Sequence, residues 1–193
     1  MVRRSIRLAL TALGAVLLGG LLGCAEAARP EYMVPAVSPT PTVAAGPFHK
    51  GIAVARVGGG EETQPWMLSR VANDDLRVAL EAALARRGYL SDQGADAPYR
   101  LDAFLVDINP GPPAITLVLH AFIRYTLTRV ADGTVLMDEV IDASFIATID
   151  DAFYGVRRLQ LANEGAIRAN IAELIARLDD LETSLTEKAG GDT

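Results

Sequence analysis

The chain has 193 residues, with 24 Asp and Glu against 18 Lys and Arg, a net charge of −6 and a single cysteine. An acidic chain is an unlikely nucleic-acid partner, because binding to phosphates depends on clustered cations, so we expect no nucleic acid. One cysteine cannot form an intrachain disulfide, and a domain of this length can be stable without one.

The first 23 residues have the layout of a secretory signal peptide. Arg3, Arg4 and Arg7 precede a mostly apolar run from Leu8 to Leu22. A membrane-spanning helix needs about 20 apolar residues, so a transmembrane anchor is the weaker alternative. Removing the three arginines leaves 15 cationic against 24 acidic side chains, a net charge near −9.

The cysteine stands where the apolar run ends. Leu21, Leu22, Gly23 and Cys24 resemble the bacterial lipobox, in which a diacylglyceryl group joins the thiol and cleavage makes Cys24 the first residue. A free thiol is the alternative, but a lone exposed cysteine is a liability in an oxidising compartment. Because Ala25 stands where an Asp would favour the inner membrane, the resemblance implies a lipid anchor on the periplasmic face of the outer membrane.

Residues 24–47 are expected to form the lipidated Cys24 and a Pro-rich tether. The stretch after Cys24 holds five of the ten prolines. In polyproline II geometry, at ~3.1 Å per residue, it would reach roughly 70 Å and let the domain stand off the membrane. We expect the periplasmic domain at 48–185 and a disordered tail at 186–193.

The domain has the apolar patterns of four strands and two helices. They predict strands at 51–57, 99–109, 114–130 and 134–149, and helices at 74–87 and 159–181. The order is β-α-β-β-β-α. The economical arrangement is an α+β two-layer sandwich, a four-stranded mostly antiparallel sheet with both helices on one face.

The last two strands are joined by Ala131, Asp132 and Gly133. A three-residue loop with Gly133 left-handed keeps one sheet face apolar, whereas a two-residue turn mixes apolar with polar side chains. The longer loop predicts these pairs: Leu127 with Met137, Tyr125 with Glu139, Ile123 with Ile141, Ala121 with Ala143, Leu119 with Phe145, and Ile115 with Ile149.

The same register defines a semi-apolar strip on the opposite face. A contiguous apolar surface with charged surroundings is typical of a docking surface. The tether could instead fold back over it through Tyr32, Met33 and Val34, or the apolar side chains could simply tolerate exposure. The candidate partner surface comprises Val118, Phe122, Arg124, Val140, Asp142 and Ile146.

Catalytic and metal sites find little support. The sequence has no G-x-S-x-G or H-E-x-x-H motif, and His49 and His120 are its only histidines. Asp138 and Asp142 could form a glycosidase-like pair, but a cross-strand link between Asp142 and the diagonal Arg124 is the better interpretation. We expect no catalytic residues, no cofactor and no metal.

Residues 12–182 resemble a family. The lipobox, the first strand and helix, APYRLDA at 97–103 and EGAIRANIAELIARL at 164–178 are similar to YajG-type outer-membrane lipoproteins and to the auxiliary lipoproteins of ABC-type transport. The resemblance implies a non-catalytic binding or assembly accessory of an envelope complex, with lipid transport as one candidate. The partner would be an envelope protein or a second copy of the chain. A lipid carrier with a pocket between helices and sheet, or an envelope enzyme, are the alternatives.

Overall fold

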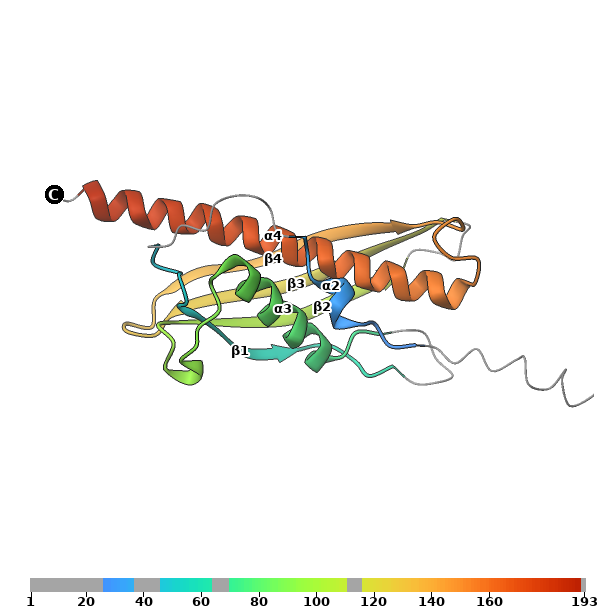
Figure 1. Ribbon diagram of the computed structural model, residues 1–193, viewed down its shortest axis with the longest axis horizontal. Helices are drawn as coiled ribbons and strands as arrows, with labels where there is room; N and C mark the ends of the chain where they lie inside the picture. Colours follow the sequence, from blue (N-terminus) through green and yellow to red (C-terminus); the bar gives the residue numbers. More distant parts are fainter. Residues whose placement is uncertain (1–25, 37–45, 64–69, 111–115, 192–193) are drawn as a thin grey trace, which may run out of the picture.

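The computed structural model describes residues 26–36, 46–63, 70–110 and 116–191. Its element order agrees with the sequence-based expectation, apart from a short helix before the first strand and a 3-10 turn before the second (Figure 1). The elements are α2 (Pro30–Met33), β1 (Ile52–Gly58), α3 (Asn73–Arg87), η1 (Gly94–Asp96), β2 (Tyr99–Pro110), β3 (Leu117–Arg129), β4 (Val135–Ala147) and α4 (Gly155–Gly191).

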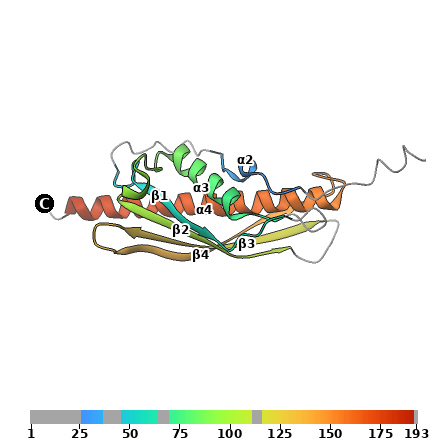
Figure 2. The ribbon, with the colours of Figure 1, turned by 90° about the horizontal axis from the view of Figure 1, so that it is seen from below.

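The four strands form one sheet in the order β1-β2-β3-β4. β1 and β2 are parallel, and the other two neighbouring pairs are antiparallel. α3 provides the long connection that parallel strands require. Figure 2 shows α3 and α4 on the same side of the sheet, which confirms the expected α+β fold with both helices on one face.

α3 ends at the predicted residue and begins at Asn73, one residue before the predicted start. Asp74 and Asp75 lie in its first turn, Arg86 and Arg87 lie in its last, and these charges complement the helix dipole. Gly88 adopts the left-handed conformation, with φ of 82°, that commonly terminates a helix.

The predicted register of the β3–β4 hairpin is confirmed. The described pairs include Ile123 with Ile141 and Leu119 with Phe145, and Gly133 is left-handed with φ of 70°. The expected pair Ile115–Ile149 falls outside the described residues.

The loop of this hairpin differs from the expectation by one residue. The Arg129 amide donates to the Thr134 carbonyl over 2.8 Å, so the four residues 130–133 form the loop rather than three. The register shifts between Leu127 and Thr128, because Thr128 pairs with Val135 and leaves Leu136 as the extra residue of a bulge. The bulge absorbs the longer loop and keeps the apolar face intact.

The core lies between the sheet and the two long helices. Alternate residues of β3 point into it, as the period of a strand requires. α4 contributes Leu159, Ala162, Ala166, Ile167, Ile171, Leu174 and Leu178, all buried. Gly165 lets α4 lie close against β4, because a Cβ there would lie 2.3 Å from Cγ of Phe145.

A buried asparagine fixes α4 on the sheet. Asn170 Nδ2 donates to the carbonyls of Ala121 (2.9 Å) and Ile141 (2.7 Å), and its Oδ1 accepts the Tyr125 hydroxyl (3.0 Å). A buried amide must be satisfied in this way, so the contacts specify the rotation and register of the helix.

Both ends of the domain extend further than the sequence predicts. α4 continues to Gly191, through the first part of the expected disordered tail, because Leu181 and Leu185 still pack against the core. Residues 26–36, expected within the tether, include α2 and bury Ala28, Met33 and Val34. They lie against α3 and α4, and not over the opposite sheet face as the fold-back alternative proposed (Figure 2).

Candidate functional site

The outer face is the face of the sheet that points away from α3 and α4 (Figure 2). Apolar side chains project from it on β2, β3 and β4. Four of them are more than half exposed: Phe104 (54%), Val106 (52%), Val140 (54%) and Ile146 (54%). Isolated exposed apolar residues are ordinary, but these four belong to one sheet face.

Strand pairing places all six predicted surface residues on the outer face. Val118 lies opposite Ile146, Phe122 opposite Asp142, and Arg124 opposite Val140. Phe122 is half-buried and stacks on His120, with ring centroids 6.1 Å apart and planes at 16°. The structure thus brings the predicted residues together, while their role stays a prediction.

The charged pairs of the outer face differ from the expectation. Arg124 bonds Asp138, with Nη2–Oδ2 at 2.6 Å and Nε–Oδ1 at 2.7 Å, and Asp142 pairs with His120 Nδ1 at 3.1 Å. The predicted Arg124–Asp142 link is therefore wrong. Both aspartates lie diagonal to Arg124, and Asp138 offers the two-pronged geometry that guanidinium favours, supplemented by the Thr126 hydroxyl at 3.3 Å.

The Arg124 guanidinium lowers the pKa of the Asp138 carboxyl below its ordinary value. A carboxyl held ionised in this way is suited to an ion pair and poorly suited to donating a proton. Asp138 and Asp142, which were considered as a pair for glycoside hydrolysis, therefore take part in two separate cross-strand contacts.

β2 contributes two outer-face residues that the sequence interpretation missed. Phe104 lies opposite Arg124, and Val106 is the extra residue where the β2–β3 register shifts between Leu105 and Asp107. The alternation of Leu101, Ala103 and Leu105 could have assigned Phe104 to this face. The bulge at Val106 has no comparable signal in the sequence.

A hollow of about 550 Å³ adjoins this strip where β1 meets β2. Arg56 and Asp102 line it, with Arg56 Nη2 2.6 Å from Asp102 Oδ2, and this contact lowers the pKa of the Asp102 carboxyl. The lining also includes Val57, Arg77, Phe104, Arg124 and Thr126.

A second hollow, of about 540 Å³, lies beside β1. It is lined by residues of β1, α3 and the α3–β2 connection, among them Val54, Glu81 and Leu90. Both hollows lie along β1, at the edge of the sheet, and charged side chains such as Arg56, Arg77 and Glu81 line them, whereas a lipid carrier needs a mainly apolar pocket. They therefore lend no support to the carrier alternative.

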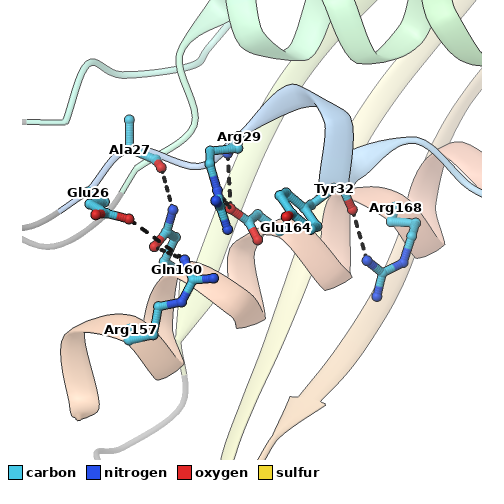
Figure 3. Close-up of polar contacts among 8 residues, drawn as sticks. All are labelled: Glu26, Ala27, Arg29, Tyr32, Arg157, Gln160, Glu164 and Arg168. Atoms are coloured by element: carbon cyan, nitrogen blue, oxygen red, sulfur yellow. Dashed lines mark hydrogen bonds and ion pairs between the residues drawn. The ribbon is translucent and has the colours of Figure 1, made fainter. Parts of the chain in front are cut away.

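The N-terminal segment, residues 26–36, is held on α4 by polar contacts along the helix (Figure 3). Buried Glu164 accepts from the Arg29 amide (3.1 Å) and from Nε of Arg29 (3.4 Å). Three further contacts involve other residues of α4: Gln160 Nε2 to the Ala27 carbonyl (2.7 Å), Arg168 Nη1 to the Tyr32 carbonyl (2.8 Å), and Arg157 Nη1 to Glu26 Oε2 (3.8 Å).

Cys24, the predicted lipidation site, lies outside the described residues. It precedes Glu26 by two positions, so two peptide units span the distance between their Cα atoms. At ~3.3–3.6 Å per residue, that distance is at most about 7 Å. The Pro-rich residues therefore do not separate Cys24 from the domain.

Among the residues that the structure describes, no three His, Cys, Asp or Glu side chains gather as potential ligands of a metal ion. Within the same residues, no helix has the length and apolar character needed to cross a membrane.

No known family model and no curated protein sequence matches this chain. Solved structures are similar to it. Protein XCC0632 from Xanthomonas campestris is 14% identical, with 74% of this chain and 85% of that one covered and a TM-score of 0.48. A candidate lipoprotein from Caulobacter crescentus is 20% identical, with 72% and 93% covered and a TM-score of 0.48.

The hypothetical protein CT253 from Chlamydia trachomatis has a TM-score of 0.50 at 13% identity. The match covers 69% of this chain and 97% of that one. This likeness concerns the fold alone.

Proposed function

We propose that this protein is a non-catalytic lipoprotein of the cell envelope, anchored by Cys24 at the periplasmic face of the outer membrane, that binds an envelope protein through its outer face. The observation that carries the proposal is the uncovered strip of Phe104, Val106, Val140 and Ile146, each more than half exposed.

The anchor rests on the sequence at the end of the apolar run. Lipidation explains why the only cysteine stands at position 24, directly after Leu21, Leu22 and Gly23. Two or three acyl chains bind a bilayer effectively permanently, because each buried methylene contributes roughly 0.8 kcal/mol. Ala25 favours the outer membrane over the inner one.

Replacing the cysteine tests the anchor. Cys24→Ser should abolish lipid labelling and leave the signal peptide uncleaved or the protein wrongly located. Mass spectrometry and membrane fractionation measure both results. An unchanged mass and unchanged membrane attachment would contradict the lipoprotein assignment.

The composition of the outer face supports a protein as its ligand. Protein interfaces combine an apolar centre with a polar rim, and aromatic residues and arginine are enriched in them. Here Phe104 and Val140 flank Arg124 across three neighbouring strands, and the Arg124 charge is already balanced by Asp138. A partner could cover this area without leaving that charge unpaired.

The resemblance to auxiliary lipoproteins makes a transport complex of the envelope the first partner to examine. A second copy of the chain is the competing occupant of the same face. Both partners would cover the same apolar strip, so a substitution in the strip does not tell them apart. The mass of the crosslinked native complex does.

Charge substitution on the two sides of the domain tests the proposal. Phe104→Glu should leave the domain folded and weaken recovery of the partner after mild crosslinking in membranes. Val78→Glu is the matched control, because Val78 is 52% exposed on α3, behind the sheet. Equal recovery with both variants would exclude the outer face, and an adduct of twice the chain mass would identify self-association.

A further inference from the structure

The connection between β4 and α4, with the first turn of α4, carries an exposed apolar tip made of Ile149, Phe153, Tyr154 and Val156. Phe153 and Tyr154 are each 77% exposed, and Ile149 and Val156 are 43% and 45% exposed. The two aromatic rings meet edge to face, with centroids 5.6 Å apart. Two adjacent aromatic side chains exposed to water are unusual in a loop and typical of an interaction site, so we expect the tip to contact an apolar environment.

Hydrogen bonds fix the backbone that presents these rings. The Asp151 carboxylate accepts from the amide (2.7 Å) and the hydroxyl (2.9 Å) of Thr148. Arg158 Nη1 donates to the carbonyls of Ala152 (3.0 Å) and Phe153 (3.2 Å). With these four hydrogen bonds in place, the aromatic side chains project from a braced backbone.

The tip lies at the end of the domain where the described N-terminal segment begins (Figures 1 and 2). Arg157 and Gln160, in the first turns of α4, contact Glu26 and Ala27 directly. Cys24 is only two residues before Glu26 in the chain. Any acyl chain on Cys24 must therefore enter the bilayer beside this tip.

The geometry points to docking of the tip into the lipid headgroup region, a step that rests on the proposed lipid anchor at Cys24. Tyr and Phe side chains are suited to this boundary, because an aromatic ring enters the apolar side while the Tyr hydroxyl stays hydrated. The charges of Asp150 and Asp151 are matched by those of Arg157 and Arg158 in the first turn of α4, so the ligand that fits the tip is a zwitterionic bilayer surface.

Docking of the tip gives the domain an orientation. α4 starts at the tip and runs for 37 residues, about 55 Å at 1.5 Å per residue. The β3–β4 hairpin and the end of α4 lie at the opposite end of the domain (Figure 1). The membrane would meet the tip first, and the outer face would stay accessible from the side.

Single tryptophans report this orientation in the mature lipidated protein. Trp66 is the only native tryptophan, so Trp66→Phe provides the background. Phe153→Trp tests the tip, and Val135→Trp, at a position 55% exposed beside the far hairpin, is the matched control. Both variants are reconstituted in phosphatidylcholine vesicles, with and without brominated acyl chains.

Docking predicts that the emission of the Phe153→Trp variant shifts to shorter wavelength and is quenched by brominated lipid, while the emission of the Val135→Trp variant is neither shifted nor quenched. Quenching of neither variant in a chain that floats with the vesicles would overturn docking and leave the anchor intact. Quenching of both would overturn the tip-first orientation. A chain without lipid mass that fails to float would overturn the anchor itself.

Discussion

The two faces of the sheet come from the same strands and differ in burial and in charge. On the helix-covered face, Leu119, Ile123 and Leu127 are fully buried, and the polar atoms of Asn170 are bonded to the sheet. On the outer face, Phe104 and Val140 are more than half exposed, and the charges are paired across strands. The difference teaches that the alternation of side chains along one strand can specify a buried face and an exposed apolar face together.

The largest contrast should come from truncating one side chain on each face. Ile123→Ala should cost about 2–5 kcal/mol of unfolding free energy, because it leaves a cavity in the packed layer. Val140→Ala, one strand away on the outer face, should change it by no more than about 0.5 kcal/mol. Denaturant unfolding measures both. Similar losses would mean that the outer face is also covered in solution.

Asn170 tests whether the polar contacts under α4 contribute to stability. Asn170→Leu should cost about 1–3 kcal/mol, because it leaves the buried Tyr125 hydroxyl and the carbonyl oxygens of Ala121 and Ile141 without this partner. Adding Tyr125→Phe should cost less in this background than in the wild type. Strictly additive losses in the double-mutant cycle would contradict a shared network.

Gly133 tests the register that separates the two faces. Gly133→Val should cost roughly 1–3 kcal/mol, because a β-branched residue is strained at a φ of 70°. Gly133→Asn is the control, since asparagine tolerates the left-handed region. Thermal unfolding compares the two variants. A neutral valine would show that the hairpin can adopt another turn.

The smallest expected effect concerns pH and the outer-face ion pair. The pKa of Asp138 is lower in the folded chain than the ordinary value of about 3.9, so its stabilisation is complete above that value. It is lost as the pH falls through the folded pKa. Asp138→Asn should therefore weaken the fall in the free energy of unfolding as the pH decreases below about 4. The same pH dependence in both proteins would argue against the ion pair in solution.

The order of the strands and the hairpin register were predictable from the sequence, because both depend on local alternation. Leu119 and Ile123 lie opposite apolar residues of β4 in the register that follows from a loop ending at Gly133. The bulges at Leu136 and Val106 were not predictable, since a single extra residue costs little and leaves no compositional mark.

The contacts of the N-terminal segment could not be read from its composition. Prolines suggested a free tether, but Met33 is completely buried and Arg29 meets Glu164, 135 positions away. Such long-range contacts depend on the finished surface of α3 and α4. The aspartate that pairs with Arg124 could not be predicted either. Two aspartates are equally spaced from Arg124 in the sheet, and they differ only in their local geometry.

The most direct test of the central claim is site-specific photocrosslinking on the two sides of the domain, in native membranes. A photoreactive residue replacing Phe104 probes the outer face, and the same residue replacing Val78 probes the solvent side of α3. We expect a discrete protein adduct from position 104 and none from position 78. An adduct from position 78 alone, or none from position 104, would contradict binding through the outer face.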